Sequence, residues 1–229
     1  MEIIKTINLH KTYDESAVPV HAVNDVSLSF DAGEFTAIVG PSGCGKTTLL
    51  NLIGGLDNPT SGEVIIDGIN LYSLKPKEIT DFRLRNIGFV FQAYNLIPVL
   101  SAKENVEFIM TLQGVPKEER DARVEKLLEQ VGLKDQMDRR PGELSGGQQQ
   151  RIAVARALAA NPKFVLADEP TANLDSASTN NLLDIMLKLN ETENTTFIFA
   201  THDSRVMKKA RRLIELDDGK VISDKTVSD

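Results

Sequence analysis

The chain has 229 residues, of which 41% are hydrophobic and 26% are charged, enough for one large α/β domain with its own core. Its net charge of −7 argues against a nucleic-acid partner, because surfaces that bind nucleic acid are usually basic. The single cysteine excludes an intramolecular disulfide and fits a reducing cytoplasm. No secretory signal is recognised at Met1–Lys5, and no stretch approaches the roughly 20 apolar residues that span a bilayer.

Two strands are predicted near the start of the chain, at residues 3–9 and 24–30. In the second, Val26, Leu28 and Phe30 alternate with polar residues, which is typical of a strand with one buried face. The segment between these strands is polar and is predicted to be a loop, which carries Tyr13, Pro19 and His21. A turn at 31–34 leads into a short apolar strand at 35–39.

The next segment reads GPSGCGKT and fits the phosphate-binding loop pattern G-x-x-x-x-G-K-[ST]. A predicted helix follows from Thr48, so the loop has the strand before it and the helix after it that this motif needs; a chance match by a glycine-rich turn is therefore disfavoured. The glycines let backbone N–H groups approach a triphosphate, and the helix adds the positive end of its dipole. Lys46 would lie near the β- and γ-phosphates, and Thr47 would ligate Mg²⁺. The predicted nucleotide-binding residues are Gly40, Pro41, Ser42, Gly43, Cys44, Gly45, Lys46 and Thr47, with Cys44 interpreted as a small residue chosen for its size.

Residues 76–140 are predicted to form a mainly helical subdomain inserted into the α/β core, after a short strand at 64–66. The insertion contains a charged helix at 76–85, a strand at 87–91 followed by Gln92, and an unusually apolar loop at 94–100. Ser101 and Glu104 form a predicted capping box that opens a helix to about Gln113. A further helix is predicted at about 117–131, with Val124, Leu127, Leu128 and Val131 on one face.

The sequence LSGGQ at 144–148 opens a predicted helix of about 146–160. Ser145 offers a hydroxyl and the glycines offer free N–H groups at the helix start, which makes a second anion site. One triphosphate needs no second site nearby, so this one indicates a nucleotide bound to another copy, in a head-to-tail pair with two shared sites. The alternative is that Ser145 is a simple N-cap.

A buried strand at 164–167 runs directly into Asp168 and Glu169. Downstream of a phosphate-binding loop, Asp168 has the place of a Mg²⁺ ligand, and Glu169 is a candidate general base for a water that attacks the γ-phosphate. The alternative is a carboxylate pair at an ordinary strand end. A helix at 176–190, a strand at 196–200 that runs into Thr201-His202-Asp203, a short helix and strands at about 211–216 and 220–223 complete a largely parallel sheet.

The order of these motifs resembles that of ATP-binding-cassette (ABC) ATPases over essentially the whole chain. The motifs are the phosphate-binding loop, Gln92 after a strand, LSGGQ at 144–148, Asp168-Glu169, Asn173-Leu174-Asp175 and His202. The stretches QAYNLIP at 92–98 and LSGGQQQR at 144–151 are most similar to the subgroup that serves lipoprotein release, macrolide export and antimicrobial-peptide export. Asn173 stands where many members of the family have alanine.

The resemblance implies an α/β fold, with a P-loop NTPase core built on a mainly parallel sheet, an N-terminal antiparallel β-subdomain and an inserted α-helical subdomain. It implies a single ABC ATPase domain over 1–229. Residues 1–75 and 160–229 would form the catalytic core with its β-subdomain, and about 76–159 would form the helical signature subdomain.

The resemblance also assigns roles to single residues. Tyr13 would stack on adenine, unless it is an exposed loop tyrosine, and Gln92 would contact Mg²⁺ and the attacking water, unless it is a solvated strand end. His202 would contact the γ-phosphate and orient the water. Ser145 and Gly147 would close on the γ-phosphate of the opposite protomer, with Asp175 at the dimer seam. The resemblance adds three nucleotide-binding residues, Thr48, Gly146 and Gln148. The implied catalytic residues are Lys46, Gln92, Glu169 and His202. The implied Mg²⁺ ligands are Thr47, Gln92 and Asp168.

The implied function is that of an ATPase subunit of a membrane transporter of the exporter or lipoprotein- and peptide-extruding type. Two copies would sandwich two MgATP, and a separate integral membrane permease would hold the pair at the cytoplasmic face of the cell membrane. Leu96, Ile97, Val99 and Leu100 are predicted either to line a groove for a permease helix or to pack locally into the core. The alternative function is a non-transport ABC ATPase that transmits conformational change in a cell-division or signalling complex.

Overall fold

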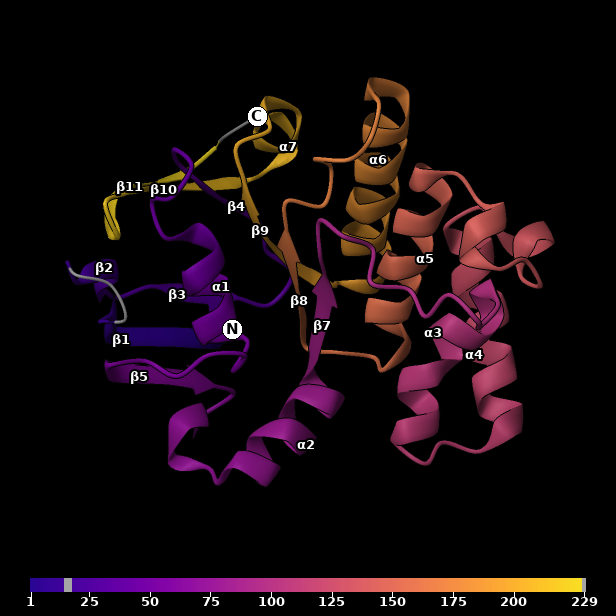
Figure 1. Cartoon of the computed structure of the whole chain (residues 1–229), viewed down its shortest axis with the longest axis horizontal. Helices are drawn as coiled ribbons and strands as arrows, with labels where there is room; N and C mark the ends of the chain where they lie inside the picture. Colours follow the sequence, from indigo (N-terminus) through magenta and orange to yellow (C-terminus); the bar gives the residue numbers. More distant parts are fainter. Residues whose placement is uncertain (15–17, 228–229) are drawn as a thin grey trace.

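The structure, a computed structural model, describes residues 1–14 and 18–227. At its centre is a six-stranded sheet in the order β11-β10-β4-β9-β8-β7, in which every neighbouring pair except β10 and β11 is parallel. A second, antiparallel sheet has the order β2-β1-β5-β6, with β3 paired to β1. Figure 1 shows the antiparallel sheet and α1 on one side of strands β7 to β9, and helices α3 to α6 on the other.

The elements follow the predicted order. The central strands are β4 (Phe35–Val39), β7 (Ile87–Val90), β8 (Phe164–Asp168), β9 (Thr196–Thr201), β10 (Arg212–Asp217) and β11 (Lys220–Thr226). The antiparallel strands are β1 (Glu2–Tyr13), β2 (Val20–Val26), β3 (Ser29–Asp31), β5 (Ser61–Ile66) and β6 (Ile69–Asn70). The helices are α1 (Lys46–Ile53), α2 (Pro76–Asn86), α3 (Ala102–Leu112), α4 (Lys117–Gln130), α5 (Gly146–Ala159), α6 (Ser176–Glu193) and α7 (Ser204–Lys209), and short 3₁₀ helices lie at Leu71–Ser73, Lys134–Gln136 and Pro141–Glu143.

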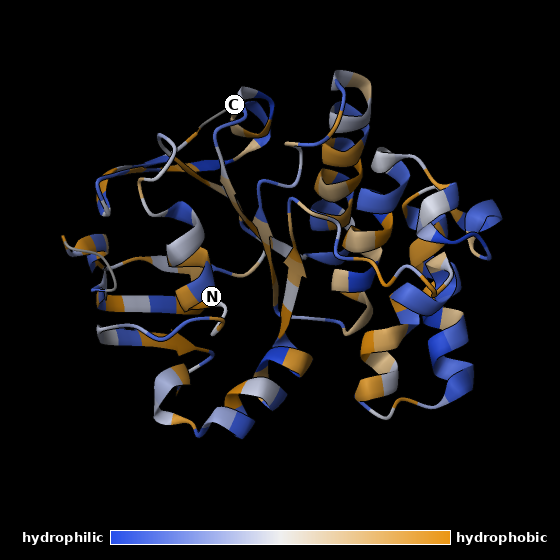
Figure 2. Cartoon of the chain, in the orientation of Figure 1, coloured by the Kyte–Doolittle hydropathy of each residue, from blue (hydrophilic) through white to orange (hydrophobic). Residues whose placement is uncertain are grey.

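Alternate residues of the central strands face two separate apolar cores. Phe35, Ala37 and Val39 of β4 belong to the core shared with α3, α4, α5 and α6, whereas Ile38 belongs to the core shared with α1 and the antiparallel sheet. Side chains alternate across a strand, so a strand buried on both faces needs an almost continuous apolar run, as in FTAIV. Figure 2 shows hydrophobic colour along the central strands, while α4 is mostly hydrophilic. Helices α3 to α6, here called the helical layer, therefore lie on one face of the central sheet, and α1 with the antiparallel sheet lies on the other.

Two features near the amino terminus differ from the prediction. The predicted strand at 24–30 is broken into β2 and β3 after Val26, where the Thr6 side chain replaces ladder bonds. The Thr6 hydroxyl donates to the Val26 carbonyl oxygen at 3.1 Å and accepts from the Leu28 N–H at 2.9 Å. The predicted alternation is nevertheless confirmed, since Val26, Leu28 and Phe30 are all buried.

The other difference is the length of β1, which continues past residue 9 and pairs with β2 as far as Tyr13 and Val20. Tyr13 and His21 therefore lie on strands and not in a loop. Residues 15–17 of the predicted loop lie outside the described residues.

The helical layer begins at the predicted capping box. The Ser101 hydroxyl accepts from the Glu104 N–H at 3.2 Å, and the Glu104 carboxylate accepts from the Ser101 N–H at 2.7 Å, which confirms that prediction. The apolar face predicted for α4 is also confirmed, because Val124, Leu127 and Leu128 are buried. β7, by contrast, pairs with β8 at the edge of the central sheet, so this part of the range 76–159 belongs to the sheet and not to the helical layer.

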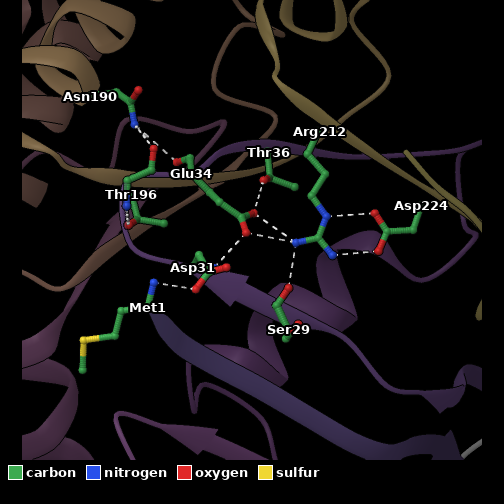
Figure 3. A network of polar contacts seen from close by, with 10 residues as sticks. Met1, Ser29, Asp31, Glu34, Thr36, Asn190, Thr196, Arg212 and Asp224 are labelled. Atoms are coloured by element: carbon green, nitrogen blue, oxygen red, sulfur yellow. Dashed lines mark hydrogen bonds and ion pairs between the residues drawn. The ribbon is translucent and has the colours of Figure 1, made fainter. Parts of the chain in front are cut away.

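A polar network ties the amino-terminal strands to the carboxyl-terminal hairpin (Figure 3). Arg212 donates to the two Asp224 carboxylate oxygens at 2.8 and 2.7 Å, to both Glu34 carboxylate oxygens at 3.1 Å and to the Ser29 carbonyl oxygen at 2.7 Å. The hydrogen bond to Asp224 and the charge of Glu34 raise the pKa of Arg212, so the guanidinium stays charged. Over the described residues 1–14 and 18–227, no helix has both the length and the apolar character needed to cross a membrane.

Candidate active site

The phosphate-binding loop connects the end of β4 to the start of α1. Two of its glycines are required by close backbone approach: a Cβ on Gly40 would lie 2.1 Å from the Leu216 carbonyl oxygen, and one on Gly45 would lie 2.0 Å from that of Ala22. Gly45 has a φ of +104° at the N-cap of α1, a conformation that favours glycine. Among the residues that the structure describes, a Cβ on Gly43 would meet nothing within 4 Å, so these residues leave space beside the middle of the loop. The loop therefore presents its backbone and the first N–H groups of α1 to a bound anion.

Lys46 is held within this loop. Its ammonium group donates to the carbonyl oxygens of Gly40 and Pro41, both at 2.8 Å, and the residue is 7% exposed. The thiol of Cys44 lies 3.8 Å from the same nitrogen and is buried with the α1 leucines, which fits its interpretation as a small packing residue. The charge of Lys46 thus lies at the loop, where a phosphate oxygen can compete with the two carbonyl oxygens.

Thr47 and Asp168 meet across the loop. The Thr47 hydroxyl donates to Asp168 Oδ1 at 3.0 Å. Burial raises the pKa of the Asp168 carboxyl, and the charge of Glu169 raises it further, although Thr47 and Lys46 oppose this. A hydroxyl and a carboxylate are the oxygen ligands that Mg²⁺ prefers, and a cation would relieve the cost of burying this carboxylate. No three His, Cys, Asp or Glu side chains form a metal cluster within the part of the chain that the structure describes, so Mg²⁺ at Thr47 and Asp168 would need phosphate or water oxygens as well.

Glu169 is positioned by β8 and β9 together. Its backbone φ of +45° is uncommon for a side-chain-bearing residue, and its N–H donates to the Ala200 carbonyl oxygen at 2.9 Å. The Thr201 hydroxyl donates to Glu169 Oε2 at 3.0 Å, and His202 Nδ1 lies 2.6 Å from Glu169 Oε1. The carboxylate is 17% exposed, whereas the His202 side chain is 72% exposed. An oriented carboxylate next to an accessible imidazole can accept a proton from water.

Tyr13 lies at the end of β1, where its hydroxyl donates to Asp57 Oδ2 at 2.8 Å and is also hydrogen-bonded by the Thr48 side chain. Burial, followed by the hydrogen bond to Asp57, raises the pKa of Tyr13. Thr48 is on the first turn of α1, so the tyrosine adjoins the phosphate-binding loop.

Gln92 follows β7 and is exposed. Among the described residues its side chain forms no hydrogen bond with Thr47 or Asp168; its carbonyl oxygen instead accepts from Asn173 Nδ2 at 3.0 Å. Two carbonyl oxygens farther along the loop, those of Tyr94 and Asn95, accept from the guanidinium of Arg156 on α5. Hydrogen bonds to its backbone carbonyl oxygens thus hold this loop in place, and the Gln92 side chain remains available to contact a ligand.

Ser145 caps α5. Its hydroxyl accepts from the Gln148 N–H at 3.3 Å, and the Gln148 side chain accepts from the Ser145 N–H at 2.8 Å. A Cβ on Gly146 would lie 2.6 Å from the Tyr94 hydroxyl, and one on Gly147 would lie 2.9 Å from that of Ser178. Asp175 caps α6 in the same way, accepting from the N–H and the hydroxyl of Ser178. Ser145 is therefore the N-cap of α5, as the alternative interpretation holds. Helix α5 lies on the opposite face of the central sheet from α1.

Most of the site residues predicted from the sequence fall into two groups. Lys46, Thr47, Thr48, Asp168, Glu169 and His202 come together at the carboxyl ends of neighbouring strands and at the start of α1, where Val39 pairs with Thr201 and Asp168 with Ala200. Ser145, Gly146, Gly147, Gln148 and Asp175 lie in the helical layer.

Some contributing residues were not predicted. Thr201 belongs to the Thr-His-Asp triplet, and its hydroxyl reaches Glu169 only because β9 lies next to β8. Asn173 belongs to the Asn173-Leu174-Asp175 motif, but no contact was predicted for its side chain, which donates to the Gln92 carbonyl oxygen. Asp57 carried no sequence signal, because its contact with Tyr13 depends on the fold.

Comparison with known proteins identifies the family. The family model described as ABC transporter matches residues 23–172. An uncharacterized ABC transporter ATP-binding protein of Thermotoga maritima is 44% identical over 220 residues, covering 96% of this chain and 94% of its own length. The macrolide export ATP-binding/permease protein MacB of Aggregatibacter actinomycetemcomitans is 44% identical over 224 residues; the match covers 98% of this chain but only 35% of MacB.

A solved structure shows the same fold. The dimeric structure of the ATP-binding cassette MJ0796, bound to ADP and Pi in a post-hydrolysis state, has a TM-score of 0.90 and 43% identity, and the match covers 99% of this chain and 100% of that one. The α/β fold implied by the resemblance is thereby confirmed. The chain belongs to the ABC transporter family and is an ATPase cassette of that family.

Proposed function

We propose that this cassette hydrolyses MgATP as a pair of copies and powers an exporter-type integral membrane permease, which holds the pair at the cytoplasmic face of the cell membrane. The observation that carries the proposal is the convergence of Lys46, Thr47, Asp168, Glu169 and His202 at the carboxyl ends of β4, β8 and β9. This edge of a parallel sheet is where α/β proteins bind ligands and carry out chemistry.

Each residue has a role that its contacts allow. Lys46 exchanges its two carbonyl partners for oxygens of the β- and γ-phosphates. Thr47, Asp168 and Gln92 would hold Mg²⁺, which would neutralise charge on the phosphates. Glu169 accepts the proton of the attacking water: Thr201 and His202 each occupy one lone pair of its carboxylate, and lone pairs remain for the water. His202 is exposed enough for a γ-phosphate to contact it.

The second copy is inferred from the position of α5. The first N–H groups of a helix have no partner within the helix, and those at Gly146 and Gly147 belong to the layer on the far side of the sheet from Lys46. In the proposal these groups and Ser145 bind the γ-phosphate held by the other copy, and Asp175 lies at the seam. The dimer of MJ0796 supports this arrangement by analogy.

The permease is proposed to dock in a groove of about 480 Å³ between α2, β7, α3 and α5. Apolar side chains at its mouth include Leu56, 44% exposed, and Phe108, 37% exposed. The loop 94–100 was interpreted either as part of a groove for the permease or as local core packing, and its residues differ in this respect. Ile97 lines the groove, whereas Leu96 packs against the core of the helical layer. The printed name of MacB, which joins an ATP-binding part to a permease, supports a permease partner.

A sedimentation experiment tests this coupling. Tagged wild-type protein expressed in its own cells is expected to sediment with the membranes, whereas Phe108→Asp remains in the supernatant with its ATPase activity intact, because a charge in the groove opposes apolar docking. The matched control is Ile222→Asp, at an apolar position on β11 that is 58% exposed, which should sediment like the wild type. Wild-type protein found only in the supernatant would contradict the permease partner, and equal sedimentation of both variants would contradict the groove.

A further inference from the structure

The ring of Tyr13 is held by residues from three parts of the fold. Asp57, in the loop after α1, accepts from the Tyr13 hydroxyl at 2.8 Å, and Thr48 of α1 hydrogen-bonds the same hydroxyl. Lys11 lies two residues before Tyr13 on β1, and both side chains lie on the same side because each reaches the Asp57 carboxylate. The Lys11 ammonium lies 4.8 Å from the centroid of the Tyr13 ring, within the range of a cation–π contact.

Asp57 joins these contacts into one unit. Its Oδ1 accepts from the Lys11 ammonium at 2.7 Å while its Oδ2 accepts from Tyr13, so a single carboxylate fixes both the cation and the ring. The Lys11 side chain is 13% exposed and that of Asp57 is 28% exposed, so the ion pair is largely shielded from water. Burial alone would raise the pKa of Asp57, but the hydrogen bonds from Lys11, Tyr13 and the Asn58 N–H lower it, and the carboxylate stays charged.

The backbone around Asp57 is also fixed. The Tyr72 hydroxyl lies 2.7 Å from the Asp57 carbonyl oxygen, and Lys11 donates to the Asn58 carbonyl oxygen at 2.7 Å. The Thr12 N–H donates to the Thr60 hydroxyl at 2.9 Å, which joins the end of β1 to the same loop. The carboxylate that orients Tyr13 is therefore part of a rigid segment that begins at the end of α1.

We propose that Asp57 and Lys11 are positioning residues for the nucleobase. They hold the Tyr13 ring next to the phosphate-binding loop with one face covered by the ammonium, so that a purine base stacks on the opposite face. The proposal rests on the proposed nucleotide site and deepens it, because it assigns the base-dependent part of the affinity to an ion pair outside the recognised motifs. A phosphate group alone does not reach the ring, so its affinity should not depend on Asp57 or Lys11.

The test compares binding of ADP and of inorganic pyrophosphate, two ligands that lack a γ-phosphoryl group to hydrolyse, by equilibrium titration. Tyr13→Ala should weaken ADP binding about 5- to 150-fold, the range of base–aromatic stacking, and leave pyrophosphate binding within about twofold. Asp57→Ala and Lys11→Met should each weaken ADP binding about three- to tenfold, as expected for the loss of a hydrogen-bonded anchor, with pyrophosphate again unchanged. Tyr13→Phe, which keeps the ring and removes the hydroxyl, should fall in the same range.

The controls separate positioning from a general loss of structure. Asp67→Ala removes a different part-exposed ion pair, with Lys163, and should change neither affinity. In a Tyr13→Ala background, Asp57→Ala should have no further effect on ADP, because the ring through which it acts is absent. If Asp57→Ala and Lys11→Met weaken both ligands equally, or if the effect of Asp57→Ala persists without the ring, the positioning role is wrong. If Tyr13→Ala leaves ADP binding unchanged, the stacking role in the proposed function is wrong as well.

Discussion

Replacing Glu169 by glutamine tests the proposed base with little change of shape. The Glu169 side chain is 17% exposed, and its two oxygens contact the Thr201 hydroxyl and His202 Nδ1. Glutamine keeps an oxygen that can accept from Thr201 and an amide that can face His202, so the fold and the nucleotide affinity should be retained. What is lost is the ability to accept a proton at neutral pH.

The expected loss is that of a general base. Removing one lowers a rate by about 10²- to 10⁴-fold, or about 3–5 kcal/mol in activation free energy. Phosphate release at saturating MgATP measures this rate, ATP titration measures affinity, and a sizing column detects an ATP-bound dimer that Glu169→Gln should accumulate. The matched control is Glu193→Gln at the end of α6, which neutralises a carboxylate that is 19% exposed and paired with Lys126 of α4, and which should hydrolyse ATP at the wild-type rate. A Glu169→Gln variant that releases phosphate at near the wild-type rate would refute the assignment of the base.

Three further predictions concern other parts of the molecule. Lys46→Ala removes the ammonium held by the Gly40 and Pro41 carbonyl oxygens and should weaken ATP binding about 10-fold or more in a titration; unchanged affinity would contradict its phosphate role. Arg212→Met leaves the Glu34 and Asp224 carboxylates without their cation and should lower the free energy of unfolding by about 3 kcal/mol. In a thermal melt this corresponds to a Tm lower by roughly 10 °C. A Tm within about a degree of that of the wild type would show that the network contributes little. The hydrogen bonds that Asp203 accepts from Arg205 and Thr171 lower its pKa from 3.8 to about 2, although burial opposes this shift. The resulting stabilisation, about 2 kcal/mol, is full above pH 3.8 and is lost as the pH falls through 2. The stability difference between wild type and Asp203→Asn in denaturant titrations should therefore shrink over that range, and a constant difference would argue against it.

The parts of the fold that local chemistry determines could be predicted from the sequence. The Ser101–Glu104 capping box and the apolar face of α4 depend on residues three or four positions apart, and both are present as predicted. The strand, loop and helix around Lys46 follow from one contiguous motif. The fold of the whole chain was available through the family resemblance and not through periodicity alone.

The parts that depend on distant partners could not be predicted. The break between β2 and β3 arises because Thr6, about 20 residues earlier, takes over the backbone groups of Val26 and Leu28. β1 extends to Tyr13 over polar residues because β2 pairs with them, which no hydrophobic pattern shows. Asp57 contacts Tyr13 across 44 positions of sequence, so only the fold reveals it.

The central claim is that a complete catalytic site needs the phosphate-binding loop of one copy and the α5 start of another. Mixing two inactive variants tests it most directly: Lys46→Ala keeps the Ser145 end of α5 intact, and Ser145→Arg keeps the loop intact. In a head-to-tail pair each mixed dimer regains one complete site, so an equimolar mixture should hydrolyse ATP well above either variant alone, up to roughly a quarter of the wild-type rate. A mixture no more active than the sum of the two variants would show that both elements act within one chain and would contradict the claim.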